Sequence, residues 1–411
     1  MTESSPKPYD VVVAGGGMIG TSLALALAPL GVRIAVSEAV ARSAVAQPSF
    51  DERSTALSRS SQRFFEAIGL WPEIVAASTP IRSIHVSEQG RFGFSHIDAA
   101  EQGVEALGYV VINRVLGEVL QRALVSHAGI DFLCPSQIVG TTTRANAVRV
   151  AVQTGLGESE LSGRLLVAAD GAKSNVREMI GIGSEVSDYG QAAVIGNLQS
   201  ELAHENRAFE RFTESGALAM LPINEGRTAF VWILGSADAE RVMSASDADF
   251  LVELQNTFGH RLGAFSRIGR RASYPLALSR ANGLTSRRAV VVGNAAHGLH
   301  PVAAQGFNLG LRDVAALSEC IADAHAAGED PGAANVLERY AAWRAEDQHK
   351  LVRFTDGLVQ LFGDRRLPAR MLRSVGMLGF DLVPGVRGVF ARHTMGLAGR
   401  LPRLSRGVPL Q

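Results

Sequence analysis

Near its amino terminus the chain reads Val11-Val12-Val13-Ala14-Gly15-Gly16-Gly17-Met18-Ile19-Gly20, an apolar β-branched run that leads directly into spaced glycines. Such a run is typical of a buried strand in a parallel sheet. Residues 21–30 then follow a small-residue and Leu-rich helical pattern, and residues 32–36 read as a second strand. The stretch therefore predicts a strand, a glycine loop, a helix and a strand, which is the opening unit of a dinucleotide-binding fold.

Each residue of this loop has a physical reason to be there. Gly15 allows the tight turn, Gly17 lets the backbone approach a pyrophosphate, and Gly20 lets the helix pack closely on the strand. The helix begins at Met18 and Ile19, where free N–H groups and the positive end of the dipole favour phosphate. We therefore expect these five residues to contact a dinucleotide.

Glu38 stands 18 residues past Gly20, directly after the second predicted strand. A carboxylate at this spacing can accept hydrogen bonds from the adenosine ribose. The alternative is a glycine-rich turn in an ordinary α/β protein. The fingerprint does not by itself distinguish FAD from NAD.

Two later segments also change from an apolar strand to a polar loop. Residues 165–169 lead into Asp170-Gly171, and residues 288–292 lead into Gly293-Asn294-Ala295-Ala296-His297, with a Pro/Gly-containing loop over 300–310. A strand end can deliver a polar side chain to a ribityl chain, and the loop can present N–H groups to a flavin ring. The alternative is two unrelated strand–turn–helix units. The candidate cofactor contacts are Asp170, Gly293, Asn294, Pro301, Gln305, Gly306, Phe307 and Asn308.

Further motifs are Phe50-Asp51-Glu52-Arg53-Ser54-Thr55-Ala56-Leu57-Ser58 and Gly108-Tyr109-Val110-Val111, which stands before Arg114. With the segments above, they resemble the FAD-dependent ubiquinone-biosynthesis hydroxylases, relatives of para-hydroxybenzoate hydroxylase, over nearly the whole chain. The resemblance implies FAD as the cofactor, with Arg53 and Arg114 among its contacts. It also implies NAD(P)H or another electron donor as a transient reductant.

Asn294 marks a branch of that family, because most other members carry Asp there. Asn294, His300-Pro301 and residues 305–310 together make the chain most similar to the branch that hydroxylates 2-polyprenyl-6-methoxyphenol. This implies hydroxylation of a polyprenyl (methoxy)phenol intermediate of ubiquinone biosynthesis by O₂, through a flavin C4a-hydroperoxide. Two alternatives remain, an FAD hydroxylase of a soluble aromatic metabolite and a largely structural flavin-binding member of a biosynthetic assembly.

No catalytic residue is assigned by these patterns. His297 and His300 flank the flavin loop, where we expect them to serve packing and hydrogen bonding rather than acid–base chemistry. His85 and His96 fall on strands of the predicted substrate sheet and are weaker candidates. No motif indicates a metal site.

The order of motifs predicts an α/β protein with an FAD-binding dinucleotide fold interleaved with an antiparallel-sheet substrate domain. We expect the FAD-binding domain over 1–75, 102–185 and 276–345, the substrate domain over 76–101 and 186–275, and a helical C-terminal region over 346–411. Alternating residues predict a hairpin of strands 81–86 and 92–97. Strands over 208–212, 217–221 and 228–234 are expected to continue that sheet.

Composition narrows the class of protein. The 411 residues are 46% hydrophobic, and 40 basic residues balance 40 acidic ones, which gives no reason to expect nucleic acid as a partner. Cys134 and Cys320 are far apart, so neither a disulfide framework nor a thiolate metal cluster is indicated. The start lacks the apolar segment of a signal peptide, and no apolar stretch is long enough to span a membrane. These features favour a cytoplasmic location.

The C-terminal segment is basic and apolar together. From Arg365 to Gln411 there are nine Arg and one acid, Asp381, with Leu, Met, Val and Phe between them. Such a segment suits an anionic membrane surface or a protein partner, and it equally suits an ordinary solvated helical face. A polyprenylated substrate favours peripheral attachment to the inner face of the cytoplasmic membrane, beside other ubiquinone-biosynthesis proteins.

Overall fold

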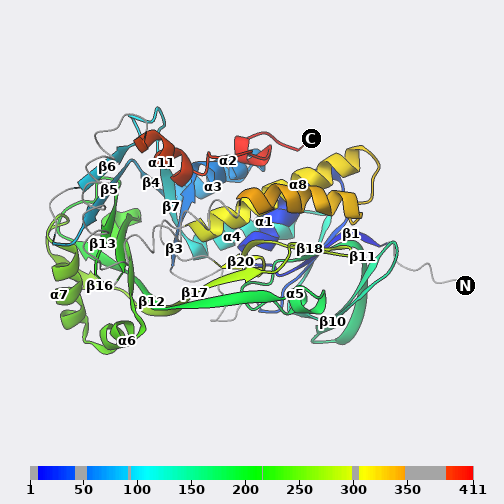
Figure 1. Cartoon of the computed structure of the whole chain (residues 1–411), viewed down its shortest axis with the longest axis horizontal. Helices are drawn as coiled ribbons and strands as arrows, with labels where there is room; N and C mark the ends of the chain where they lie inside the picture. Colours follow the sequence, from blue (N-terminus) through cyan, green and yellow to red (C-terminus); the bar gives the residue numbers. More distant parts are fainter. Residues whose placement is uncertain are drawn as a thin grey trace, which may run out of the picture.

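The computed structural model describes residues 8–41, 53–90, 94–214, 216–298, 305–347 and 386–410. Two large sheets and one small sheet organise this part of the chain (Figure 1). The mixed α/β fold class predicted from the sequence is confirmed.

The eight-stranded sheet is parallel at its centre. Its order is β18-β19-β11-β1-β2-β8, and the neighbours from β19 to β8 are parallel to each other. β9 and β10 extend it as antiparallel strands from β11. The strands are β1 (Tyr9–Ala14), β2 (Ile34–Ser37), β8 (Ile130–Leu133), β9 (Ser136–Thr143), β10 (Val148–Thr154), β11 (Gly157–Ala168), β18 (Thr285–Ser286) and β19 (Ala289–Val291).

Alternate side chains of the central strands point to opposite faces of this sheet, and each face packs into its own apolar core. Helices cover one of the two faces. Val11 and Val13 of β1 face α1 (Met18–Leu27), α4 (Asn113–Ser126) and α8 (Gln305–Ala326) in the largest core cluster. Val12 and Ala14 lie in a second cluster with β9, β10 and α5 (Asn175–Met179). Both faces of the parallel strands are therefore buried, as continuous apolar runs require.

The nine-stranded sheet is mostly antiparallel, in the order β20-β17-β12-β15-β14-β13-β5-β6, with β16 beside β12. Helices α6 (Ser236–Ser244) and α7 (Asp247–Phe258) cover one face through an aromatic core that includes Phe230, Trp232 and Phe250. The strands are β5 (Ser83–Glu88), β6 (Phe94–Asp98), β12 (Ser184–Ser200), β13 (Arg207–Phe212), β14 (Ala217–Pro222), β15 (Arg227–Gly235), β16 (Phe265–Ile268), β17 (Ala272–Ala281) and β20 (His297–Gly298).

A three-stranded sheet, β3-β7-β4, joins the two units. Its strands are β3 (Ser54–Ser58), β4 (Thr79–Ile81) and β7 (Gly108–Ile112), with α2 (Arg59–Ala67) and α3 (Trp71–Ala76) after β3. In β7, Tyr109 and Val111 face the core of the parallel sheet, whereas Val110 packs with Ala208 and Ala229 of the nine-stranded sheet. Alternate side chains of β7 therefore pack into the core of the parallel sheet and against the nine-stranded sheet.

The predicted hairpin exists as antiparallel β5 and β6, and the three following predicted strands are β13, β14 and β15. Two long strands, β12 and β17, were not predicted from the sequence, and they pair with each other on both sides of a register irregularity between Asp188 and Gln191. Figure 1 shows them extending from the α6 and α7 end of the molecule toward α5.

The C-terminal region is helical where it is described, in α11 (Val386–Thr394) and a short turn (Leu404–Arg406). Ala391 and Met395 pack with Ile97 and Leu107, so α11 lies against the β6 and β7 side of the molecule. Residues 348–385, which hold the first part of the basic segment, lie outside the described residues. None of the helices that the structure describes is long and apolar enough to cross a membrane.

Asn308 fastens α8 to the strand–helix unit of β3 and α2. Its side chain is 3% exposed, and its Oδ1 accepts from Ser58 N at 2.9 Å and from Ser61 Oγ at 2.7 Å. Its Nδ2 donates to the Ala56 carbonyl at 2.9 Å. The side chain of this predicted cofactor residue therefore bonds to the protein through both its oxygen and its nitrogen.

We predict that Asn308→Leu lowers the free energy of unfolding by about 3 kcal/mol, because buried donors and an acceptor lose their partner together. Urea unfolding at a fixed FAD concentration measures this. Asn335→Ala is the control, since Asn335 is exposed and should change stability by less than about 0.5 kcal/mol. Equal stability of the Asn308→Leu variant and the wild-type protein would contradict the fastening role.

Candidate functional site

The first glycine loop lies against the carboxyl end of β11. Gly15 has φ +101°, and a Cβ there would lie 2.5 Å from the Ala169 carbonyl oxygen. A Cβ on Gly20 would lie 1.9 Å from the Gly15 carbonyl oxygen. Both positions therefore require glycine, as the sequence predicted, and the loop is held beside the second predicted segment.

The amino end of α1 is open for an anion. Gly17 precedes the helix in an extended conformation, and within the described residues no side chain caps it. The first turn, from Met18, contains no acidic residue. Free N–H groups with no competing carboxylate are what a pyrophosphate requires at a helix start, so the loop fits a dinucleotide.

Glu38 follows β2 and is placed against the same loop. Its side chain is 7% exposed. Its Oε2 accepts from Gly16 N at 2.7 Å, and its Oε1 accepts from Val40 N at 2.8 Å. These two hydrogen bonds fix the orientation of the Glu38 carboxylate. Because a carboxylate oxygen can accept more than one hydrogen bond, Glu38 can still accept from ribose hydroxyl groups.

Asp170 caps the helix that follows the second segment. Its carboxylate accepts from Ser174 Oγ and from Val176 N, the latter at 3.1 Å. Ser174 in turn accepts from Arg177 N at 2.9 Å, which satisfies the start of α5. Arg177 is 3% exposed and donates to the Ala295 carbonyl at 3.0 Å, so this side chain joins the second segment to the third.

The third segment meets the first through Ile19. Gly293 has φ +61°, and a Cβ there would lie 3.0 Å from Ile19 Cγ2. A Cβ on Gly310 of α8 would lie 2.7 Å from Ile19 Cδ1. Asn294 follows in the turn after β19, and its side chain is exposed. All three glycine-bearing segments therefore converge at the carboxyl edge of β1, β11 and β19.

Asp313, fully buried in α8, holds the third segment from behind. Its Oδ2 accepts from Gly293 N at 3.0 Å and lies 2.6 Å from His297 Nε2. Its Oδ1 accepts from Arg344 Nε at 2.7 Å, and Arg344 is also fully buried. Because an ionised carboxylate only accepts, His297 donates from Nε2. His297 is thus engaged in structure, as the sequence suggested.

Opposing influences act on the pKa of Asp313. Burial raises this pKa, but the charges of His297 and Arg344 and their hydrogen bonds outweigh burial and lower it to about 2. The carboxylate is therefore ionised at neutral pH, and its charge is matched inside the protein.

Arg53 and Arg114 lie at one corner of the small sheet. Asn113 N, next to Arg114, donates to the Arg53 carbonyl at 2.8 Å. The Arg53 guanidinium lies 4.9 Å from the ring centre of Tyr274 on β17, whereas Arg114 is exposed and pairs with Glu118 at 3.1 Å. The structure thus brings Arg53 to the nine-stranded sheet.

The loop before α8 is described only in part. Gly306 and Phe307 are half-buried in the first turn of α8, and Phe307 packs against the main core. Pro301 and the side chain of Gln305 lie outside the described residues, as does His300. The sequence did not predict the hydrogen bonds that Arg177 and Arg344 make to the third segment and to Asp313. In the sequence each is only a basic residue within a predicted helix.

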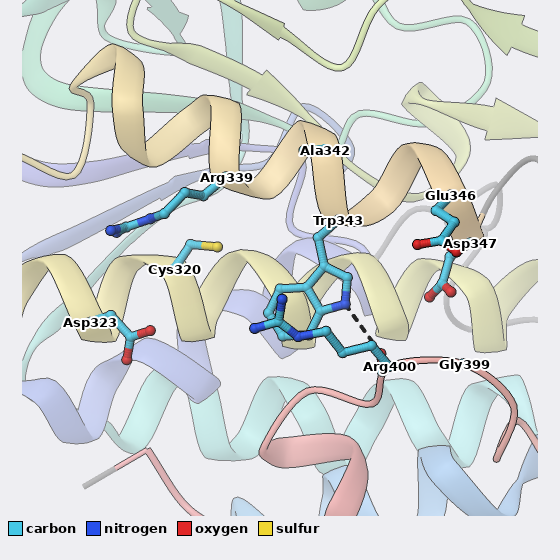
Figure 2. A pocket seen from close by; sticks show the side chains of 9 residues that line it. All are labelled: Cys320, Asp323, Arg339, Ala342, Trp343, Glu346, Asp347, Gly399 and Arg400. Carbon is cyan, nitrogen blue, oxygen red and sulfur yellow. Dashed lines mark hydrogen bonds between the residues drawn. The ribbon is translucent and has the colours of Figure 1, made fainter.

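A separate pocket of about 400 Å³ opens between the second half of α8, the helix over 334–347 and the C-terminal tail (Figure 2). The Trp343 ring lies under the Arg400 guanidinium at 4.2 Å, and Trp343 Nε1 donates to the Arg400 carbonyl at 3.2 Å. Burial raises the pKa of the Cys320 thiol there to about 11, so it is not a thiolate at neutral pH. The glycine segments instead contact the start of α8.

A parallel sheet with three loops at its carboxyl edge, joined to an antiparallel sheet, defines a dinucleotide-dependent flavoprotein architecture. The chain belongs to the FAD binding domain family, whose model matches residues 8–355. The resemblance to FAD-dependent ubiquinone-biosynthesis hydroxylases is confirmed, and so is FAD as the cofactor.

Named proteins similar to this chain are hydroxylases of the same kind. The chain is 36% identical to ubiquinone hydroxylase UbiL of Rhodospirillum rubrum, covering 100% of this chain and 95% of the relative. It is 29% identical to 3-demethoxyubiquinol 3-hydroxylase of Escherichia coli, covering 95% and 99%. Its fold is similar to that of p-nitrophenol 4-monooxygenase PnpA of Pseudomonas putida, with a TM-score of 0.79, 18% identity, and coverage of 96% and 99%. The enzyme is an FAD-dependent monooxygenase.

We predict that Gly20→Ala abolishes FAD binding, because its Cβ would collide with the Gly15 carbonyl and open the loop. FAD content after purification and fluorescence titration of the apoprotein measure this. Gly155→Ala is the matched control, since a Cβ there meets nothing within 4 Å. Full FAD retention by the Gly20 variant would show that the loop does not bind the cofactor.

We predict that Asp313→Asn lowers the free energy of unfolding at pH 7 by about 3 kcal/mol, because the buried Arg344 keeps Asp347 but loses the other of its two carboxylate partners. The folded pKa near 2 lies below the ordinary 3.8, so the wild-type carboxylate adds stability above pH 4 that is lost as pH falls toward 2. Urea unfolding between pH 3 and 7 should therefore show a smaller pH dependence in the variant.

The control for this experiment is Asp238→Asn, which changes an exposed carboxylate. It should leave both the stability at pH 7 and its pH dependence nearly unchanged. An Asp313 variant with the wild-type slope would contradict an ionised buried carboxylate.

Proposed function

We propose that the enzyme introduces a ring hydroxyl group into a polyprenyl methoxyphenol on the route to ubiquinone, using O₂ and a reduced electron donor. The convergence of the three glycine-bearing segments beside an antiparallel sheet carries this proposal. The printed names of the two relatives above, a ubiquinone hydroxylase and a 3-demethoxyubiquinol 3-hydroxylase, support the substrate class.

The cofactor contacts in this proposal combine the predicted set with the observed geometry. The α1 start and its glycines take the pyrophosphate, and Glu38 takes the ribose. Asp170 and Asn294 lie at the ends of β11 and β19, where the ribityl chain would pass. Arg53, Arg114, Gly293 and residues 301 and 305–308 complete the proposed set.

When bound, FAD supplies the two-electron chemistry that activates O₂ for transfer to an electron-rich ring. The protein then has to hold the ring, exclude water and manage the phenolic proton. The face of the nine-stranded sheet turned away from α6 and α7 suits the ring, because Ile195, Val231 and Ala219 there are apolar and only half-buried. The oxygen-transfer route implied by the family resemblance belongs to this proposal.

The domain limits are likewise proposed. We assign 1–75, 102–185 and 276–345 to the FAD-binding domain, and 76–101 and 186–275 to the substrate domain. The strands β12 and β17 each belong to the nine-stranded sheet across these limits, at 184–200 and 272–281. The sheets themselves are therefore the better guide to which unit a residue serves.

Peripheral attachment to an anionic membrane surface is proposed for the remaining basic residues of 365–411. Arg400 lies on Trp343, and Arg403 pairs with Glu319 and Asp323. These two cations already contact other groups of the protein, so we assign the proposed contact to the others, such as the exposed Arg392.

We predict that cells lacking the protein lose ubiquinone in aerobic growth and accumulate the unhydroxylated polyprenyl phenol. Quinone profiling by mass spectrometry measures both. Complementation with the wild-type gene should restore ubiquinone, and complementation with Gly20→Ala should not. Normal ubiquinone in the deletion strain, with no second hydroxylase present, would favour a soluble aromatic substrate.

A further inference from the structure

One line of register partners crosses the nine-stranded sheet from β17 to β6. Neighbouring partners in such a line point to the same face. The line consists of Ala272, Ile195, Val231, Ala219, Glu210, Val86 and Ser95. Its one ionisable side chain is Glu210 of β13.

The alternation of side chains along β13 shows on which face of the sheet this line of residues lies. Phe209, next to Glu210, packs under α7 with its ring 5.3 Å from that of Phe258. Because adjacent residues of a strand point to opposite faces, Glu210 points away from α6 and α7. Val86, Ile195 and Val231 lie on that face too.

Two packed clusters lie on either side of Glu210 along its own strand. Ala208, two residues before it, packs with Ile81 and Val110 of the small sheet. Phe212, two residues after it, packs with Ile233 and other apolar residues. Between these clusters the side chains of the line around Glu210 are half-buried. The carboxyl group therefore stands in an apolar, half-buried strip, which is the kind of surface that an aromatic ring contacts.

The surroundings of Glu210 favour its neutral form. Among the described residues its carboxyl group makes no hydrogen bond and no ion pair. Burial raises its pKa to about 7. Other charged or titratable groups on this face include Glu88, opposite Phe212, and Tyr274, opposite Ala193 and under Arg53. Farther along the sheet the same register adds Arg227 and Arg267, both opposite Gln199. A carboxyl group with a pKa near neutrality can take up and release a proton under working conditions.

We propose that Glu210 is the general base that removes the proton from the phenolic hydroxyl of the substrate. This inference rests on the proposed function, because it presupposes a phenol bound on this face. The phenolic O–H bond breaks, the proton binds a Glu210 carboxylate oxygen, and the electron pair stays on the phenolate oxygen. Nothing is oxidised or reduced in this step. The phenolate ring is richer in electrons and therefore accepts an electrophilic oxygen more readily.

The test uses the full-length, FAD-loaded enzyme and 2-methoxyphenol carrying one prenyl group. Glu210→Gln keeps the size of the side chain but removes the base, so kcat should fall by about 100-fold or more. FAD affinity should stay unchanged. The wild-type rate should rise with pH and level off above about 7, whereas the variant should keep rising toward the pKa of the free phenol, about 10. Glu210→Asp should recover part of the loss.

A second measurement does not require turnover. Titration of the oxidised enzyme with the probe between pH 5 and 9 should show an affinity that changes with a pKa near 7 in the wild-type protein, and Glu210→Gln should lose this change. Glu185→Gln is the matched control, because Glu185 is exposed on β12 of the same sheet, and it should behave as the wild type.

The outcomes separate the two proposals. A wild-type enzyme whose affinity for the probe changes near pH 7 through Glu210, but that does not hydroxylate the probe, would support Glu210 and contradict the proposed function. A Glu210→Gln enzyme that retains FAD, the wild-type kcat and the wild-type pH profile would overturn the role of Glu210 and leave the function standing. The same pH dependence of probe affinity in the wild-type protein and in Glu210→Gln would also overturn it.

Discussion

The buried carboxylate of Asp313 is the constraint on which the rest of the site depends. It accepts from the backbone of Gly293, from His297 and from Arg344 at once. Those three donors come from the turn after β19, from β20 and from the helix over 334–347. A charge in a fully buried position is tolerated only with such complete pairing. The position of the third flavin segment is therefore set by electrostatics from inside the protein, with Ile19 packing on its other side.

The sequence allowed the glycine segments to be predicted because their constraints are local and steric. Gly20 is required by a contact with Gly15, five residues before it, Gly15 has a positive φ, and the β5–β6 hairpin follows from simple alternation. Arg344 was not predictable, because its partner is 31 residues away and nothing in a helical pattern distinguishes a paired internal Arg from a solvated one. Asn308 was proposed as a cofactor residue, but its side chain fastens α8 to β3 and α2.

The two faces of the nine-stranded sheet differ in a way that periodicity alone does not reveal. One face is closed by α6 and α7 with aromatic rings such as Phe230 and Trp232. Within the part of the chain that the structure describes, the opposite face has no helix of this kind over Glu210, and Ala219, Val231 and Ile195 there are only half-buried. Alternation identifies two faces of a strand, but only the placement of helices shows which one is covered. For this reason Glu210 could not be selected from the sequence, where it is one of many acids.

The order in which the strands join has a consequence for how the protein is made. β1 pairs with β11, about 150 residues later in the chain, and α1 packs on α8, which ends at Ala326. Contacts of such high sequence separation are slow to form and leave apolar strands unpaired in the meantime. Until α8 has been added, the glycine loop can contact Glu38 and Ala169 but lacks the packing of α8 on Ile19. The nucleotide site is therefore completed only near the end of synthesis, and a cofactor can contribute to stability only from that moment.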